Sequence, residues 1–223
     1  MHSKSRLLIL GAGKPHSGSH HSSLTHVDSD KNVLDWLLNS FSSIKLEDIR
    51  FIGGYRIQDI MTKYPMITYS INPRWKKSKN LESLLQVTQV EECVTYVSYS
   101  DIVYPEFVVN ELEKTAGDIV FVGDSKWAKR YVEQNESNSE LAEKYIAHDS
   151  DVLKLGTDIQ SVEASGEYIG LAKFTKKGIE LINEFKNMEE EDIRSLSIDT
   201  FIFSIQLSAS NILKTSIPDF ADN

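Results

Sequence analysis

Short apolar runs alternate with helix-periodic stretches along the first half of the chain. The run Leu7–Leu10 (LLIL) stops at Gly11, and Val33–Phe41 then carries apolar residues at the spacing of one helix face. The same alternation continues to Gly123. Strands that alternate with helices in this way pair in parallel, because each helix carries the chain back across the sheet. We therefore predict a doubly wound α/β fold, a mostly parallel sheet with helices on both faces.

The regular alternation of apolar runs and helix-periodic stretches does not continue in the second half of the chain. The polar segment Lys129–Ser150 is expected to cross the surface before a hairpin-like region over Val152–Val162, and Thr200–Leu213 is apolar but of uncertain type. Strands are predicted over Leu7–Leu10, Ile49–Gly53, Ile67–Ile71, Val94–Tyr99, Ile119–Gly123 and Tyr168–Phe174. Helices are predicted over Val33–Phe41, Ile57–Lys63, Leu81–Val87, Pro105–Lys114 and Ile179–Glu191.

The composition limits the classes of partner. With 24 basic and 33 acidic residues the net charge is −9, which disfavours nucleic acid and anionic membranes as partners. Cys93 is the only cysteine, so an internal disulfide is excluded and a reducing compartment is expected. The longest early apolar run is far too short for a membrane span or a signal peptide. We expect a cytoplasmic protein of one domain over residues 1–223.

The loop after the first predicted strand is a candidate anion site. Gly11 and Gly13 flank Ala12 and allow backbone N–H groups to approach an anion closely, and Lys14 adds a positive charge. The spacing matches neither a P-loop nor a dinucleotide-binding fingerprint. A tight turn between strand and helix explains the two glycines equally well.

Four histidines follow in the same loop: His16, His20, His21 and His26. Their spacing fits no standard metal site, and the serines and glycines among them indicate a flexible segment. Contact with a phosphate is favoured over metal binding.

A carboxylate follows the fourth predicted strand in the segment Tyr96–Glu106 (YVSYSDIVYPE). Asp101 lies at the carboxyl end of this strand, on the same edge of the sheet as the glycine loop. A hard oxygen ligand there is suited to hold Mg²⁺ against nucleotide phosphates. Taken alone, Asp101 is explained as well by capping of the helix that Pro105 opens.

Taken together, these segments resemble the nucleotidylyltransferases that activate sugar phosphates and phosphocholine-like compounds with a nucleoside triphosphate. Ile71–Leu85 (INPRWKKSKNLESLL) places the resemblance in the cytidylyltransferase branch, and Phe51–Ile60 and Gly166–Phe174 are also similar to family segments. Within that branch the chain resembles domains associated with phosphonate biosynthesis. The resemblance implies a Rossmann-like three-layer sheet of the nucleotide-diphospho-sugar transferase type.

The resemblance also implies a reaction. CMP would pass from CTP to a phosphonate or phosphate acceptor, such as 2-aminoethylphosphonate or phosphocholine, with release of pyrophosphate. The expected partners are CTP and this small acceptor, and a homodimer is compatible with the interpretation. Gly11, Ala12, Gly13 and Lys14 would hold the triphosphate, Asp101 would hold Mg²⁺, and Asn80 and Ser83 would contact the base. The acceptor would be bound by residues of the second half: Asp124, Lys126, Arg130, Lys144, Glu167 and Tyr168.

Two departures from the family pattern stand out. The family's loop ends in a lysine that contacts the reacting phosphate, whereas here His16–Val27 contains no lysine and Lys31 lies too near the next helix. The family also has a second magnesium carboxylate after a late strand, yet Lys214–Asn223 resembles the helix before that strand. Two interpretations follow: either the chain lacks the C-terminal strand and tail, or Asp199, Asp219 or Asp222 takes the place of the second carboxylate.

Two other functions remain open, and a third is disfavoured. A sugar-phosphate nucleotidylyltransferase would share the site, and a degenerate nucleotide-binding domain with a regulatory or assembly role would lack the second carboxylate. A glycosyltransferase that consumes a nucleotide sugar is disfavoured, because no second acidic residue follows Asp101 at the required spacing.

Overall fold

The computed structural model describes residues 4–15, 18–77, 80–87, 91–133, 142–149, 151–185 and 213–216. In chain order the strands are β1 (Lys4–Gly11), β2 (Leu46–Gly53), β3 (Thr68–Ile71), β4 (Cys93–Tyr99), β5 (Ile119–Asp124), β6 (Lys144–His148), β7 (Asp151–Gly156), β8 (Gly166–Phe174) and β9 (Leu213–Ser216). The helices are α1 (Val33–Ser40), α2 (Ile57–Lys63), α3 (Asn80–Leu85), α4 (Glu106–Lys114), α5 (Trp127–Glu133) and α6 (Lys176–Phe185), with a 3₁₀ turn, η1, over Ser22–Leu24.

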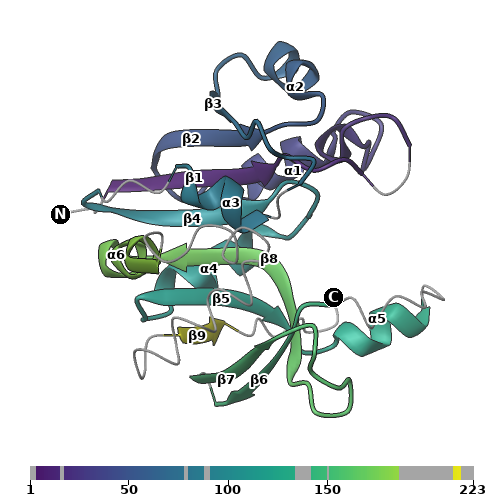
Figure 1. The fold of residues 1–223 in the computed structure, drawn as a ribbon. Helices are drawn as coiled ribbons and strands as arrows, with labels where there is room; N and C mark the ends of the chain where they lie inside the picture. Colours follow the sequence, from purple (N-terminus) through teal and green to yellow (C-terminus); the bar gives the residue numbers. More distant parts are fainter. Residues whose placement is uncertain are drawn as a thin grey trace.

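The strands form one mixed sheet in the order β3-β2-β1-β4-β8-β5-β9-β7-β6 (Figure 1). β1 pairs in parallel with β2 on one side and with β4 on the other. β8 runs antiparallel between β4 and β5, so β4 and β5 point the same way. The carboxyl ends of β1, β2, β4 and β5 therefore lie at one edge of the sheet, and the predicted mostly parallel mixed sheet is confirmed.

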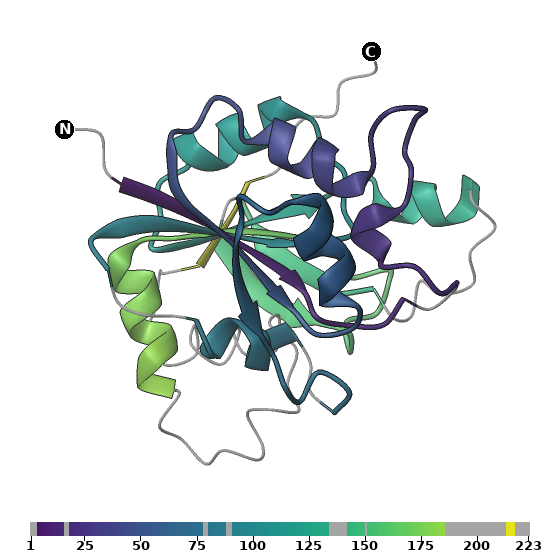
Figure 2. The same cartoon turned by 90° about the horizontal axis from the view of Figure 1, so that it is seen from above.

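Alternate residues of the strands enter two apolar cores, one on each face of the sheet. In β1, Leu7 and Ile9 pack on the face covered by α1 and α4, whereas Leu8 and Leu10 pack on the face covered by α3 and α6. Figure 2 shows these two helical layers on opposite sides of the sheet. The alternation follows from the period of two along a strand. It explains why Leu7–Leu10 of β1 form a continuous apolar run, since both faces of the strand are buried there.

The structure corrects the predicted second half of the chain. Lys129–Ser150 is not only a surface excursion, because it includes the end of α5 and all of β6. The hairpin joins β6 to β7, so its turn precedes Val152 instead of falling within Val152–Val162.

The C-terminal prediction is also wrong in part. Leu213–Ser216 forms strand β9, parallel to β5, where a helix was expected over 214–223. Backbone pairing with β5 decides this, and four residues are too few for periodicity to reveal it. Asp199, Asp219 and Asp222 lie outside the described residues.

The described part of the chain contains no helix that is long and apolar enough to cross a membrane.

The end of β1 is enclosed on both sides by its neighbours. The Ser100 amide donates to the Leu10 carbonyl at 3.1 Å, and the Tyr55 amide donates to the Ala12 carbonyl at 2.9 Å. These bonds continue the pairing of β1 with β4 and β2 beyond the regular strands. A Cβ at Gly11 would lie 2.3 Å from Cζ of Phe51 and 2.7 Å from Oγ of Ser100. Gly11 is therefore required by close packing.

We predict opposite outcomes for alanine at the two loop glycines. Gly11→Ala should lower the free energy of unfolding by about 1–3 kcal/mol, because overpacking forces neighbouring groups apart. Gly13→Ala should leave it nearly unchanged, since nothing lies within 4 Å of a Cβ built there. Urea unfolding of both variants beside the wild type measures the difference, and equal losses would contradict the prediction.

Candidate functional site

A cavity of about 580 Å³ opens at the carboxyl ends of β1 and β4. Its wall combines the loop after β1, the start of α3 and the residues that follow β4. The lining residues are Leu10, Gly11, Gly13, Lys14, Pro15, Gly18, His20, His21, Ser22, Thr25, Asn80, Tyr99, Ser100 and Asp101. Its volume is in the range of small-molecule sites.

The structure brings together most of the residues predicted to bind the nucleotide. Gly11, Gly13, Lys14, Asn80 and Asp101 all line the cavity, although they come from three separate segments of the chain. The Lys14, Asn80 and Asp101 side chains are exposed, which leaves them accessible to a ligand.

Ser83 and Ala12 occupy different positions from the rest of that set. Ser83 is buried outside the cavity lining, and its hydroxyl accepts a hydrogen bond from Nδ2 of Asn72 at 3.0 Å. Oδ1 of Asn72 in turn accepts from the Arg74 amide at 2.9 Å. Ser83 thus ties the segment that follows β3 to α3, the helix that begins at Asn80. Ala12 is buried, with its carbonyl held by Tyr55.

The buried side chain of His21 forms hydrogen bonds with the backbone at both ends of the loop after β1. Its side chain is 1% exposed, Nε2 lies 2.8 Å from the Gly11 carbonyl, and the Ser23 amide donates to Nδ1 at 3.2 Å. Because Nδ1 accepts a hydrogen bond, the neutral ring carries its proton on Nε2 and donates it to Gly11. The imidazole therefore caps η1 and holds the end of β1 at the same time.

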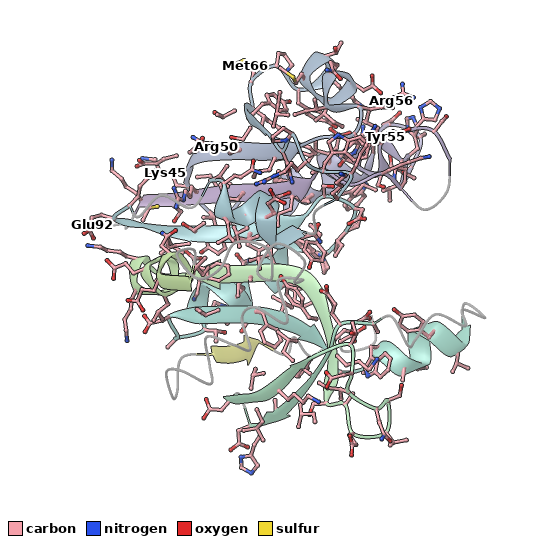
Figure 3. The ribbon with its side chains drawn as sticks, viewed as in Figure 1. Lys45, Arg50, Tyr55, Arg56, Met66 and Glu92 are labelled. Atoms are coloured by element: carbon pink, nitrogen blue, oxygen red, sulfur yellow. The ribbon has the colours of Figure 1, made fainter. Side chains whose placement is uncertain are left out.

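Two exposed hydrogen bonds also hold the loop, at Ser19. The Tyr55 hydroxyl and Nη1 of Arg56 both donate to the Ser19 carbonyl, at 3.1 and 2.7 Å. Arg56 has a φ of 47°, in the left-handed region that non-glycine residues seldom adopt. Nε of Arg56 also donates to Asp59 at 2.5 Å. Figure 3 shows Tyr55 and Arg56 at the end of the sheet where the loop after β1 emerges.

The other predicted basic residues of this region have distinct places. His20 lines the cavity, whereas His26 forms a backbone bridge with Asn32 and is not a lining residue. Lys31 lies over the Trp36 ring at 5.4 Å and does not line the cavity. His16 lies outside the described residues. No group of three or more potential metal-ligating His, Cys, Asp or Glu side chains occurs among the residues that the structure describes.

The predicted acceptor residues form a second cluster, on β5, β6 and β8. Glu167 is the register partner of Lys144 on one side and of Asp124 on the other. Lys144 is only 2% exposed, and its ammonium lies 5.9 Å from the Trp127 ring. Glu167 accepts a hydrogen bond from the Tyr131 hydroxyl at 2.8 Å. These strands therefore place a buried cation among carboxylates and aromatic rings.

The remaining members of that set border the cluster. Tyr168 is buried, with its ring 5.4 Å from that of Phe121. Oδ1 of Asp124 accepts from the Lys126 amide at 2.8 Å, in the turn that leads from β5 into α5. The Arg130 backbone lies in α5, and its side chain is outside the described residues.

Tyr99 connects the cavity to this cluster. It lines the cavity at the end of β4, its ring lies 5.8 Å from that of Tyr168, and its hydroxyl donates to Glu143 at 3.0 Å. The sequence did not single out Tyr99 or Glu143, because Tyr99 reads as part of an apolar strand. The only available signal was its place immediately before Ser100 and Asp101.

The oxygen-bearing side chains of the cavity suit Mg²⁺ that binds together with a polyphosphate. Asp101 is the one carboxylate among the lining residues, and serine, threonine and asparagine oxygens accompany it. Mg²⁺ in phosphate-binding sites uses one or two carboxylates together with substrate phosphates and water. The cavity therefore suits Mg²⁺ carried in with a polyphosphate more than a resident ion held by protein alone.

Two solved structures share the fold. A Bacillus anthracis protein provisionally assigned as a glucose-1-phosphate thymidylyltransferase has a TM-score of 0.74 and 12% identity, and the match covers 96% of this chain and 86% of that one. The CTP:phosphocholine cytidylyltransferase of Streptococcus pneumoniae has a TM-score of 0.66 and 14% identity, over 99% of this chain and 91% of that one. The fold is thus that of the nucleotide-diphospho-sugar transferase class.

Sequence similarity points to one branch of that class. The chain is 24% identical to the CTP:phosphoglutamine cytidylyltransferase of Campylobacter jejuni over 174 residues, which cover 74% of this chain and 69% of the relative. No protein-family model matches the chain. The predicted resemblance to nucleotidyltransferase enzymes, and to their cytidylyltransferase branch, is confirmed by this relative and the shared fold.

Burial lowers the pKa of His21, and this effect outweighs the opposing influence of its bond to Gly11 and of the Asp101 and Asp59 carboxylates. The folded protein therefore binds a proton at His21 less readily than the unfolded chain does. The free energy of unfolding is therefore unaffected by this difference above the unfolded pKa of about 6.5, and it decreases as the pH falls below that value.

We predict that this histidine contributes to acid sensitivity. The melting temperature should fall between about pH 7.5 and about pH 5.5, and His21→Asn should show a smaller fall than the wild type. His26→Asn is the matched control, because His26 is exposed. Scanning fluorimetry at the two pH values measures the difference. A pH response in His21→Asn as large as in the wild type would contradict the assignment.

Proposed function

We propose that the protein transfers a cytidylyl group from CTP to a small acceptor that carries a phosphate or phosphonate, with release of pyrophosphate. The observation that carries the proposal is the convergence of Lys14, Asn80 and Asp101 on one cavity at the carboxyl edge of the sheet. Similarity to a CTP:phosphoglutamine cytidylyltransferase supports CTP and a phosphate-bearing acceptor. The fold alone does not select the base, since one structural neighbour is assigned as a thymidylyltransferase.

The chemistry asks for alignment and charge neutralisation. An acceptor oxygen attacks the α-phosphorus of CTP, the new P–O bond forms, and the bond to the β-phosphate oxygen breaks. The acceptor oxygen is already anionic, so no general base is needed. Lys14 would neutralise phosphate charge, the backbone around Gly13 would contact the triphosphate, and Asn80 would contact the base. Asp101 would hold Mg²⁺, which would supply further neutralisation of the polyphosphate.

The acceptor would bind across Tyr99, at the cluster of Asp124, Lys144 and Glu167. Lys144 would pair with the anionic group of the acceptor, because a charged donor with little access to water forms strong hydrogen bonds with an anion. The Glu167 and Asp124 carboxylates and the Trp127 ring suit a cationic or amide group of the acceptor. The acceptors that fit this description are 2-aminoethylphosphonate, phosphocholine and phosphoglutamine.

Pyrophosphate release tests the reaction. Purified protein with Mg²⁺ and CTP should release pyrophosphate only when one of these three acceptors is added, and ATP, GTP or UTP should support a lower rate. Mass spectrometry should detect the CMP-linked acceptor. Binding of CTP, seen as a raised melting temperature, without turnover on any acceptor would instead favour a nucleotide-binding regulatory domain.

We predict large losses from two substitutions in the cavity. Asp101→Asn should lower kcat/KM for CTP by about a hundredfold or more, and Lys14→Met by about tenfold to a hundredfold, because each removes charge complementary to the polyphosphate. Lys31→Met and Asp30→Asn are matched controls, since neither residue lines the cavity. Excess Mg²⁺ should partly restore Asp101→Asn. Wild-type activity in either cavity variant would contradict its assigned role.

A further inference from the structure

Both ring nitrogens of His21 are used by the backbone of the same loop. One holds the Gly11 carbonyl and the other receives the Ser23 amide, so the imidazole spans the loop from its start at β1 to η1. The ring also packs edge-on against Phe51, with 5.7 Å between the ring centroids. Phe51 and Ser100 leave no room for a side chain at Gly11. Gly11 is thus enclosed by three side chains, and His21 is the one that bonds to its carbonyl.

Two successive carbonyls of the loop have fixed partners. The Gly11 carbonyl accepts from His21, and the Ala12 carbonyl accepts from the Tyr55 amide. In a planar trans peptide the N–H of the next residue points opposite to the carbonyl. The directions of the Ala12 and Gly13 N–H groups are therefore set by His21 and Tyr55. Backbone N–H groups aimed in a fixed direction are the usual means of holding phosphates in such loops.

We infer that His21 is a positioning residue for the triphosphate: its bond to the Gly11 carbonyl orients the peptide groups of the loop that receives the phosphates. The inference rests on the proposed function in assuming a nucleotide ligand, and it goes further by assigning the orientation of the loop to one side chain. His21 does not act as a base, because Nδ1 is occupied by Ser23 and Nε2 carries the proton. Its buried ring anchors the Gly11 carbonyl at the point where β1 ends.

Two substitutions separate the two hydrogen bonds. In His21→Asn the amide oxygen can still accept from Ser23, but the side chain is too short to reach Gly11. In His21→Gln the terminal amide nitrogen lies near the position of Nε2 and can still donate to Gly11. We expect His21→Asn to bind CTP about tenfold more weakly and His21→Gln to remain within about threefold of the wild type. His26→Asn, an exposed histidine outside the cavity, should bind like the wild type.

The measurement is isothermal titration calorimetry with CTP and Mg²⁺ in the absence of acceptor, repeated with cytidine. A positioning role weakens CTP binding and leaves cytidine binding unchanged, whereas a merely structural role lowers the melting temperature and affects both ligands or neither. Unchanged CTP affinity in folded His21→Asn, or equal weakening in both variants, would overturn the inference. Wild-type protein that binds CTP but turns over no acceptor would overturn the proposed function and leave this inference standing.

A measurement on the wild type covers the case in which His21→Asn does not fold. Inorganic tripolyphosphate, added to ¹⁵N-labelled protein, should shift the amide resonances of Ala12 and Gly13 more than those of Asp28 and Asp30, which are exposed and do not line the cavity. Absence of a shift at both amides would overturn the inference.

Discussion

The parallel pairing of β1 with β2 and β4 is the constraint on which the rest of the site depends. It buries β1 on both faces and brings the carboxyl ends of three strands to one edge. The bonds from Ser100 to Leu10 and from Tyr55 to Ala12 extend this pairing past the regular strands. Asp101 and the loop after β1 both line the cavity because they follow two paired parallel strands, β4 and β1. No direct bond between them is required.

The long loop after β1 is held at three positions by different types of hydrogen bond. Main-chain pairing fixes Ala12, a buried imidazole fixes Gly11, and two exposed donors fix Ser19. The buried contact is protected from water, so it contributes more per bond than the exposed pair. The loop is consequently firm where the phosphates would bind and more open to exchange near Ser19.

The sequence predicted the sheet well because its signal is local and repeated. Apolar runs and helical spacing identified β1 to β5. The shared edge of parallel strands predicted Asp101 on the side of the glycine loop, and Asp101, Gly13 and Lys14 line one cavity there. The roles of His21 and Ser83 could not be predicted. His21 depends on how the loop folds back towards Gly11, and Ser83 depends on which face of α3 is buried against Asn72. β9 was missed because it is a short strand defined by a partner far away in the sequence. β6 was missed because it lies in a segment that is polar and charged overall.

The most informative departure from the family pattern is the charge of the loop. The family uses a lysine at the end of the loop, whereas here Lys14, near its start, is the lysine that lines the cavity, and a neutral histidine organises the backbone. In the proposed reaction, fewer cations near the triphosphate would make oriented N–H groups and Mg²⁺ relatively more important for neutralising its charge. Phosphate binding by such a loop would depend on the orientation of the peptide groups between Gly11 and Lys14 more than on positively charged side chains.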